Sequence, residues 1–292
     1  MEANKVDLLL VGALARDEDV VAGLTEHRIG GAVYFGSYAA QAAGARTSLW
    51  TAISEADRKL LDPLRQDGIG VHICDSPHTA GIRNIYESAD RDRRQCQLIS
   101  RARPLTAEEM PDTSARIIHV CPLMAGEVEE SVFSAAASRA QLSLDAQGVV
   151  RKVRGDQLVF EAWTGQERLL PLVHFLKCDT AEAEFMTGLT RPDDAARALA
   201  DQGAQEVLVT RPDGVSLWAD GRIWHAPFTH RGLEGRTGRG DTCMSSYLAR
   251  RLNHEPEAAL RFAAALTSIK METPGPFRGD LKAVQKRMAQ MP

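Results

Sequence analysis

Short apolar runs alternate with amphipathic stretches along this chain, and this alternation limits the folds that the chain can adopt. Residues 6–12 (VDLLLVG) are a largely apolar run that ends at a glycine, which predicts a buried strand. The pattern then predicts a strand at 47–53, a helix at 55–66 and a strand at 71–74. Continuous apolar runs are typical of parallel strands that helices cover on both faces. The sequence therefore predicts an α/β fold with a doubly wound, mostly parallel sheet.

The same alternation continues in the second half of the chain. We expect further strands and helices at 115–120, 129–139, 142–145, 175–178, 206–210 and 256–271. Two hairpins interrupt this order. One pairs 79–86 with 95–101 around the charged turn at 90–94, and the other pairs 215–218 with 222–225 across Asp220-Gly221. Each hairpin indicates a pair of antiparallel strands that interrupts the α/β alternation.

Length and charge limit the classes of partner. The chain has 292 residues, 44% of them apolar, which suits one principal domain over residues 1–292. The formal charge of −4 gives no basic field for nucleic acid or for an anionic membrane, so we expect a small-molecule partner. The N-terminus lacks a leader pattern, and the five cysteines form no C-x-x-C pair. These features predict a cytoplasmic protein without a disulfide framework or a zinc knuckle.

The stretch 237–242 (TGRGDT) carries the most specific chemical signal. It leads into apolar residues at helical spacing, so Asp241 lies near the start of a predicted helix. Backbone N–H groups at a helix start lack intrahelical partners and bind phosphate, and a carboxylate beside them can accept a proton. The alternatives are an ordinary glycine-rich turn with Asp241 as the N-cap, or an Arg-Gly-Asp adhesion tripeptide that nothing else in the sequence supports. The stretch alone leaves these possibilities open.

Polar residues also follow two of the predicted strands. Asp179 and Glu182 open a helix one turn apart on one face, where both can act as capping residues. Gln147 and Arg151 follow the strand at 142–145, at the edge of the sheet where ligands bind. A hydrogen-bonding amide and a cation suit a polyhydroxylated ligand there.

Four stretches together resemble the ribokinase-like (PfkB) family of small-molecule kinases. Residues 237–248 resemble its C-terminal signature, and 177–188 resemble its N-x-x-E segment. Gly30-Gly31 before a helix of small residues, and 263–276 near the C-terminus, fall in the family's order. The resemblance implies a ribokinase-like fold with a small β-sheet lid, whose strands are inserted at about 18–30 and 78–102. It also implies an ATP- and Mg²⁺-dependent kinase that phosphorylates a hydroxyl of a sugar or polyol.

The resemblance assigns roles to individual residues. Asp241 would be the catalytic base, with an anion hole formed by Gly238, Arg239 and Gly240. Asp179 and Glu182 would organise the water shell of Mg²⁺. The nucleotide would contact Thr210, Gly214, Thr273 and Gly275. The acceptor would contact Asp17, Gly30, Gly31, Asn84, Gln147 and Arg151. The D-x-Q-G-x-x-R stretch at 145–151 resembles the inositol-kinase branch of the family.

Three departures from the family pattern affect the nucleotide side. Pro212 replaces a glycine, and Gly235 stands where the family has an aspartate that helps to bind an activating monovalent cation, so dependence on potassium stays open. Arg239 replaces a small residue, and it either points away from the site or adds a cation near the phosphates. Two alternatives remain. A nucleoside kinase would be favoured if Tyr34 and Phe35 stacked on a base, and a ligand-binding protein without catalysis would tolerate all three departures. An exposed lid could also form a homodimer.

Overall fold

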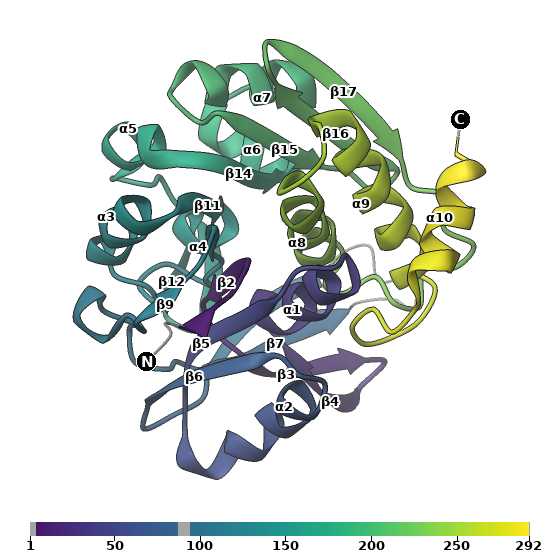
Figure 1. Cartoon of the computed structure of the whole chain (residues 1–292). Helices are drawn as coiled ribbons and strands as arrows, with labels where there is room; N and C mark the ends of the chain where they lie inside the picture. The colour runs from purple at the N-terminus through teal and green to yellow at the C-terminus, as the bar shows by residue number, and fades with distance from the viewer. Residues whose placement is uncertain (1–3, 87–93, 292) are drawn as a thin grey trace.

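The computed structural model describes residues 4–86 and 94–291, so most of the charged turn expected at 90–94 lies outside the described residues. Within them, the large sheet has nine strands (Figure 1). The order is β17 (Arg222–Pro227), β16 (Gly214–Ala219), β15 (Glu206–Thr210), β14 (Val173–Asp179), β11 (Gln141–Asp145), β10 (Ile117–Val120), β2 (Leu8–Val11), β5 (Thr47–Ile53) and β6 (Gly70–Asp75). In this order the strands from β15 to β6 are parallel, whereas β16 and β17 form an antiparallel hairpin at one edge.

Helices cover both faces of this sheet, which confirms the predicted doubly wound architecture (Figure 1). Two separate apolar clusters, one on each face, contain the inward side chains of these helices. One face carries α1 (Ala32–Ala42), α2 (Asp62–Gln66), α8 (Arg239–Arg251), α9 (Pro256–Lys270) and α10 (Leu281–Ala289). The other carries α3 (Glu130–Arg139), α5 (Gln166–Leu169), α6 (Thr180–Thr187) and α7 (Pro192–Asp201).

Local chemistry explains two features of these helices. The helix expected at 55–66 is divided into a 3₁₀ segment, η1 (Glu55–Leu61), and the short α2. Pro63 stands in the first turn of α2, where a residue without a backbone N–H is tolerated, so a new α-helix begins there after the 3₁₀ segment. Helices α1 and α8 pack closely because Gly36 leaves room for Ser245, whose Oγ would lie 2.4 Å from a Cβ at residue 36.

A second, smaller sheet packs over one edge of the cavity described below. Within the described residues it has six strands, of which β7 and β8 form the hairpin expected from the sequence. The first strand begins at residue 15 rather than 18, and the hairpin of β12 and β13 was not predicted. The order is β12 (Arg151–Arg154), β13 (Gln157–Phe160), β8 (Arg94–Ser100), β7 (Gly81–Tyr86), β3 (Ala15–Val21) and β4 (Leu24–Gly30).

The remaining elements are short. A two-stranded parallel sheet joins β1 and β9, and none of the helices in 4–86 and 94–291 combines the length and the apolar character that a membrane span needs. The five cysteines are free thiols. The short elements are β1 (Asn4–Lys5), β9 (Thr113–Ser114), η2 (Ala107–Glu109), η3 (Leu170–Leu172) and α4 (Gln147–Val150).

Candidate active site

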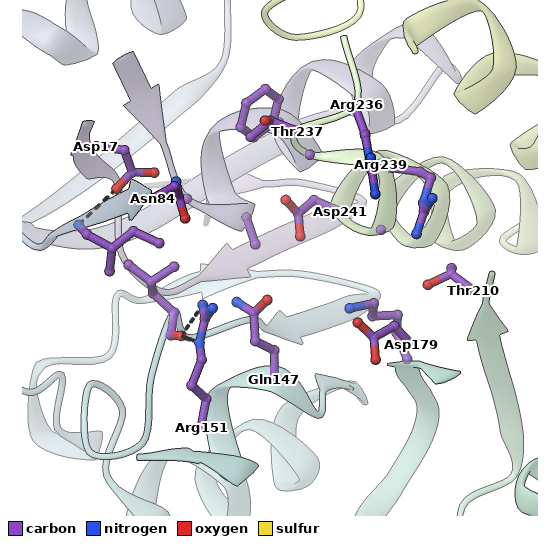
Figure 2. A pocket seen from close by; sticks show the side chains of 18 of the residues that line it. Asp17, Asn84, Gln147, Arg151, Asp179, Thr210, Arg236, Thr237, Arg239 and Asp241 are labelled. Carbon is purple, nitrogen blue, oxygen red and sulfur yellow. Dashed lines mark hydrogen bonds between the residues drawn. The ribbon is translucent and has the colours of Figure 1, made fainter. Parts of the chain in front are cut away.

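A cavity of about 280 Å³ lies where the large sheet, the small sheet and the start of α8 meet. The strands β14 and β15 end there at Asp179 and Thr210, as ligand sites in open α/β sheets require. Figure 2 shows Asp17 and Asn84 at one end of this cavity, Asp241 near its middle, and Asp179 with Thr210 at the other end. The cavity thus has two halves, with the carboxylate of Asp241 between them.

Asp241 stands in the first turn of α8 and is partly buried. Burial raises the pKa of its carboxyl from the ordinary 3.8 to about 6, and the nearby carboxylate of Asp145 reinforces this shift. The positive charges of Lys177, Lys270 and Arg151 oppose the shift. A carboxylate with a pKa near 6 is ionised at neutral pH and accepts a proton more readily than an ordinary aspartate.

The turn before Asp241 contains two glycines that the local space requires. Gly238 has a φ of +81°, and a Cβ there would lie 2.3 Å from the ring of Phe35. A Cβ at Gly240 would lie 2.9 Å from Cε of Lys177. Because α8 starts at residue 239, the N–H groups of Gly240 and Asp241 have no intrahelical acceptor, whereas the N–H of Arg239 donates to the carbonyl oxygen of Arg236 at 3.3 Å. Unpaired N–H groups at a helix start can bind an anion.

Two arginines lie beside this helix start. Arg239, whose direction the sequence left open, lines the cavity together with Arg236 (Figure 2). Both guanidinium groups point toward the end of the cavity that contains Asp179 and Thr210. This half of the cavity therefore combines helix N–H groups with cationic side chains, the combination that binds phosphoryl groups.

Lys177 completes this half, and the sequence analysis did not identify it. It is 4% exposed, and its ammonium lies 3.1 Å from Oδ1 of Asp145 and 3.4 Å from Oε2 of Glu182. Burial disfavours the charge, but the carboxylates of Asp145 and Glu182 raise the pKa of Lys177 well above its ordinary value. The available signal was a lysine within the apolar strand at 175–178, because a charge in a buried parallel strand needs a partner.

Asp179 and Glu182 form a capping box at the start of α6. The backbone N–H of Glu182 donates to Oδ1 of Asp179 at 2.8 Å, and the N–H of Asp179 donates to Oε2 of Glu182 at 2.7 Å. Glu182 is 2% exposed, and its carboxylate also accepts from Lys177. Asp179 lines the cavity. Of the two residues expected to organise Mg²⁺, the structure thus places one carboxylate at the cavity and the other behind it.

The opposite half of the cavity contains Asp17, at 8% exposure. Its Oδ1 accepts from the backbone N–H of Ile82 at 3.1 Å, which fixes the carboxylate. A Cβ at Gly30 would lie 1.8 Å from Oδ2 of Asp17, so this glycine makes room for the carboxylate. Gly31 lines the cavity and has a φ of +94°, and a Cβ there would lie 2.1 Å from the carbonyl oxygen of Ala13.

Three more residues expected at the acceptor line the same half. Asn84 is 2% exposed, and its Nδ2 donates to Oδ1 of Asp19 at 3.0 Å. Arg151 donates from Nε and Nη2 to the carbonyl oxygen of Leu123, at 3.0 and 2.8 Å. Gln147 stands at the start of α4 with its side chain in the cavity (Figure 2). A carboxylate, two amides and a guanidinium surround a space that suits a ligand with several hydroxyl groups.

The four residues expected at the nucleotide are not brought together. Thr210 lines the cavity, whereas Gly214 begins β16 and its carbonyl accepts from the N–H of Arg211 at 2.8 Å. Thr273 and Gly275 follow α9, where the carbonyl oxygen of Thr273 closely faces Gly235. Gly275 lines a second, neighbouring cavity. The loop at 210–214 is therefore a tight turn into a hairpin in this chain.

We expect Gly30→Ala to weaken acceptor binding selectively. The added methyl group would displace the carboxylate of Asp17, so the KM for the acceptor should rise about 10-fold to 100-fold while the KM for the phosphoryl donor changes less than about threefold. Steady-state kinetics with each substrate varied in turn measures both constants. Gly44→Ala is the control for a glycine change that strains the backbone away from the cavity, because Gly44 has a φ of +99° and a Cβ there meets nothing within 4 Å; both KM values should stay at the wild-type level. Equal KM values for Gly30→Ala and wild type would contradict the placement of the acceptor.

Comparisons with known proteins agree with this geometry. Residues 6–281 match the pfkB family carbohydrate kinase profile. A solved structure described as a pyrophosphate-dependent kinase in the ribokinase family, in a sulfate complex, is 35% identical, with 93% of this chain and 97% of that chain covered and a TM-score of 0.88. A second solved structure is described as a pyrophosphate-dependent myo-inositol-1 kinase converted by mutation into a myo-inositol-3 kinase. It is 34% identical, with 96% of this chain and 98% of that chain covered and a TM-score of 0.89. The ribokinase of Arabidopsis thaliana in complex with ribose and ATP shares the fold. It is 17% identical, with 97% of this chain and 99% of that chain covered and a TM-score of 0.75.

Proposed function

The chain belongs to the pfkB family of carbohydrate kinases, which are phosphotransferases acting on hydroxyl groups, and on this premise we propose that it transfers a phosphoryl group from pyrophosphate to a hydroxyl of an inositol. The observation that carries the proposal is the position of Asp241 between the two halves of one cavity. One half offers Arg236, Arg239 and Lys177 to phosphates, and the other offers Asp17 and neighbouring amides to hydroxyl groups.

Pyrophosphate is favoured over the ATP expected from the sequence for two reasons. The donor half gathers three cationic side chains, whereas of the four residues expected at the nucleotide only Thr210 lines this cavity. Pro212 also stands in a tight turn, where Arg211 donates to Asp213 at 3.1 Å and to Ser216 at 2.9 Å. A donor without a nucleoside needs phosphate contacts alone. The two relatives at 34–35% identity are pyrophosphate-dependent, which supports the same donor here.

An inositol acceptor is supported by the chemistry of the other half. Asp17, Asn84, and Gln147 with Arg151 come from three different stretches of the chain and line one space, so they could hydrogen-bond several hydroxyl groups at once. The nucleoside alternative requires an aromatic face for a base. Phe35 lines the cavity, but its ring packs against Gly238 and the ammonium of Lys270, and Tyr34 lines the neighbouring cavity instead. The myo-inositol kinase relative is in accord with a cyclic polyol rather than a nucleoside.

The reaction follows from the positions of the side chains. Asp241 accepts the proton of the acceptor hydroxyl as that oxygen forms a bond to the distal phosphorus of the donor. The bond between this phosphorus and the bridging oxygen breaks, and the departing phosphate keeps the electron pair. Lys177, Arg239 and the N–H groups at the start of α8 stabilise the charge on the transferred group. Mg²⁺, when bound through Asp179 and water, would neutralise further charge on the donor.

Purified protein tests the proposal directly. With Mg²⁺ and myo-inositol, phosphorus NMR should show an inositol monophosphate, and kcat/KM with pyrophosphate should exceed that with ATP by at least about 100-fold. The acceptor panel should include other inositols, sugars and nucleosides. Turnover with ATP but not with pyrophosphate would keep a kinase and overturn the donor. Stoichiometric binding of acceptors without turnover for any donor would favour a ligand-binding protein.

A further inference from the structure

A second cavity of about 260 Å³ lies directly behind the turn that precedes α8. It shares Asp17, Phe35, Asn84, Glu234 and Thr237 with the main cavity. Its lining also includes Lys270, the last residue of α9, which is one of the helices on one face of the large sheet. The reaction described above assigns no contact to this lysine.

Lys270 is 1% exposed, and its ammonium donates to the backbone carbonyl oxygens of Gly235 and Thr237. Its Nζ also lies 5.0 Å from the centroid of the Phe35 ring, on which the cation packs. Carbonyl oxygens and an aromatic face are ligands that an alkali cation also accepts, because they replace its hydration shell. The ammonium therefore occupies a cation site formed by the chain itself.

The cost of burying this charge shows in its pKa. Burial lowers the pKa of Lys270 from 10.5 to about 8, the carboxylate of Asp241 opposes this shift, and the charge of Arg28 adds to it. The ammonium form still predominates at neutral pH. A buried cation that persists must be held by favourable contacts. Here the carbonyl oxygens of Gly235 and Thr237 provide them.

The residues at this site do not fit an additional monovalent cation. Gly235 stands where the family has an aspartate that helps to bind such a cation, and its N–H donates to the carbonyl oxygen of Met271 at 2.9 Å. A Cβ at residue 235 would lie 1.8 Å from the carbonyl oxygen of Thr273 and 2.5 Å from that of Lys270. No side chain fits in that space, so an aspartate ligand is excluded there. The position next to these carbonyl groups already holds an ammonium.

The ammonium of Lys270 contacts the turn that leads into the start of α8. Its two acceptors precede Gly238, the N-cap of α8, and Gly238 packs on the same Phe35 ring that the ammonium contacts. Lys270 thus contacts the backbone before the helix start and the ring beneath it. A change in this backbone would move the N–H groups of Gly240 and Asp241, which hold the transferred group.

We propose that Lys270 is a positioning residue, a tethered cation that orders the turn at 235–238 and makes the enzyme independent of monovalent cations. Its role in turnover rests on the proposed function, since the turn forms the anion site of that reaction. The tether keeps the cation at a high effective concentration, so potassium in solution adds nothing to the wild-type enzyme.

The test compares wild type, Lys270→Met, Lys270→Ala and the exposed control Lys286→Met, with about 0.1 M potassium, ammonium or tetramethylammonium at equal ionic strength. Wild type and the control should show the same kcat in all three salts. Lys270→Met, which keeps the volume of the side chain, should lose about 100-fold in kcat with a KM for the acceptor within about threefold. Lys270→Ala should lose as much in tetramethylammonium and regain about 10-fold in potassium or ammonium.

Thermal melting separates this proposal from the kinase reaction. Without any donor or acceptor, potassium should raise the Tm of Lys270→Ala by about 3 °C over tetramethylammonium, and leave wild type and Lys270→Met unchanged, because the cation binds only where the ammonium and its volume are removed. Activation of wild type by potassium, or full activity of Lys270→Met, would overturn the proposal. If wild type turned over no substrate, an unchanged Tm of Lys270→Ala in potassium would overturn it as well.

Discussion

Replacing Asp241 by asparagine will lower kcat by at least about 1,000-fold and leave the affinity for the acceptor within about threefold of wild type. An amide cannot accept the proton of the attacking hydroxyl, whereas it keeps nearly the same volume and still hydrogen-bonds the acceptor. Single-turnover kinetics measures the chemical step, and calorimetry measures acceptor binding. Asp179→Asn is the matched control at the same cavity, and its loss should be smaller because it removes no proton acceptor.

The pH profile gives a second reading of the same residue. Because the pKa of Asp241 is raised to about 6, kcat/KM of wild type should rise with pH through about 6, stay level up to about 8, and fall above that pH as Lys270 loses its proton. Below that pH the carboxyl is protonated and cannot act as a base. An acid limb that stayed at the same pH in Asp241→Asn would show that another group controls the profile.

As the pH rises through about 6, ionisation of Asp241 should lower the stability of the wild-type protein while it raises the activity. A carboxyl whose pKa in the folded state is raised above 3.8 binds a proton more tightly in the folded protein, so ionisation costs stability as the pH rises through about 6. Asp241→Asn removes this cost. Its Tm should therefore match wild type below about pH 4 and equal or exceed it at pH 8. A lower Tm at pH 8 would mean that Asp241 has a packing role.

Replacing Lys177 by methionine should produce the second large effect, on stability and on turnover together. The change leaves the buried carboxylates of Asp145 and Glu182 without their cation, which should lower the free energy of unfolding by about 3–5 kcal/mol at neutral pH. It also removes a positive charge from the anion site, so kcat/KM for the donor should fall about 100-fold. Denaturant titration and steady-state kinetics measure the two effects.

Two further variants separate these effects. Lys152→Met is the control, because its ammonium lies 3.8 Å from Glu161 in a partly exposed pair, and it should cost less than about 1 kcal/mol. In Lys177→Met, adding Asp145→Asn and Glu182→Gln should restore part of the stability, since the unpaired charges are gone, without restoring turnover. Recovery of turnover in this triple variant would show that Lys177 serves the fold alone.

The large sheet was predictable because several of its strands are short, largely apolar runs between turns. Strand β2, LLLV, is buried at every position, and a run this short between turn signals is typical of a strand. The hairpin of β12 and β13 was missed for the opposite reason. Its residues are largely polar and partly exposed, such as Lys152 and Arg154, so they carry no hydrophobic period that marks a strand.

The candidate site was predictable where one short segment carries its own chemistry. The stretch at 237–242 and the residues at 179–182 were candidates because they resemble family motifs, and the structure places Asp179 and Asp241 in one cavity. Lys177 and Lys270 were missed because their roles come from contacts between distant segments, Lys270 with Gly235 and Thr237 and Lys177 with Asp145. Periodicity does not report such contacts.

A crystal structure of Asp241→Asn with pyrophosphate, Mg²⁺ and myo-inositol tests the central claim most directly. We predict that an oxygen of the distal phosphoryl group lies about 3 Å from an N–H group in the first turn of α8. An inositol oxygen should lie about 3–3.5 Å from the phosphorus and hydrogen-bond the substituted side chain. A phosphoryl group bound far from residue 241, or an acceptor whose hydroxyl groups all point away from that side chain, would contradict the account.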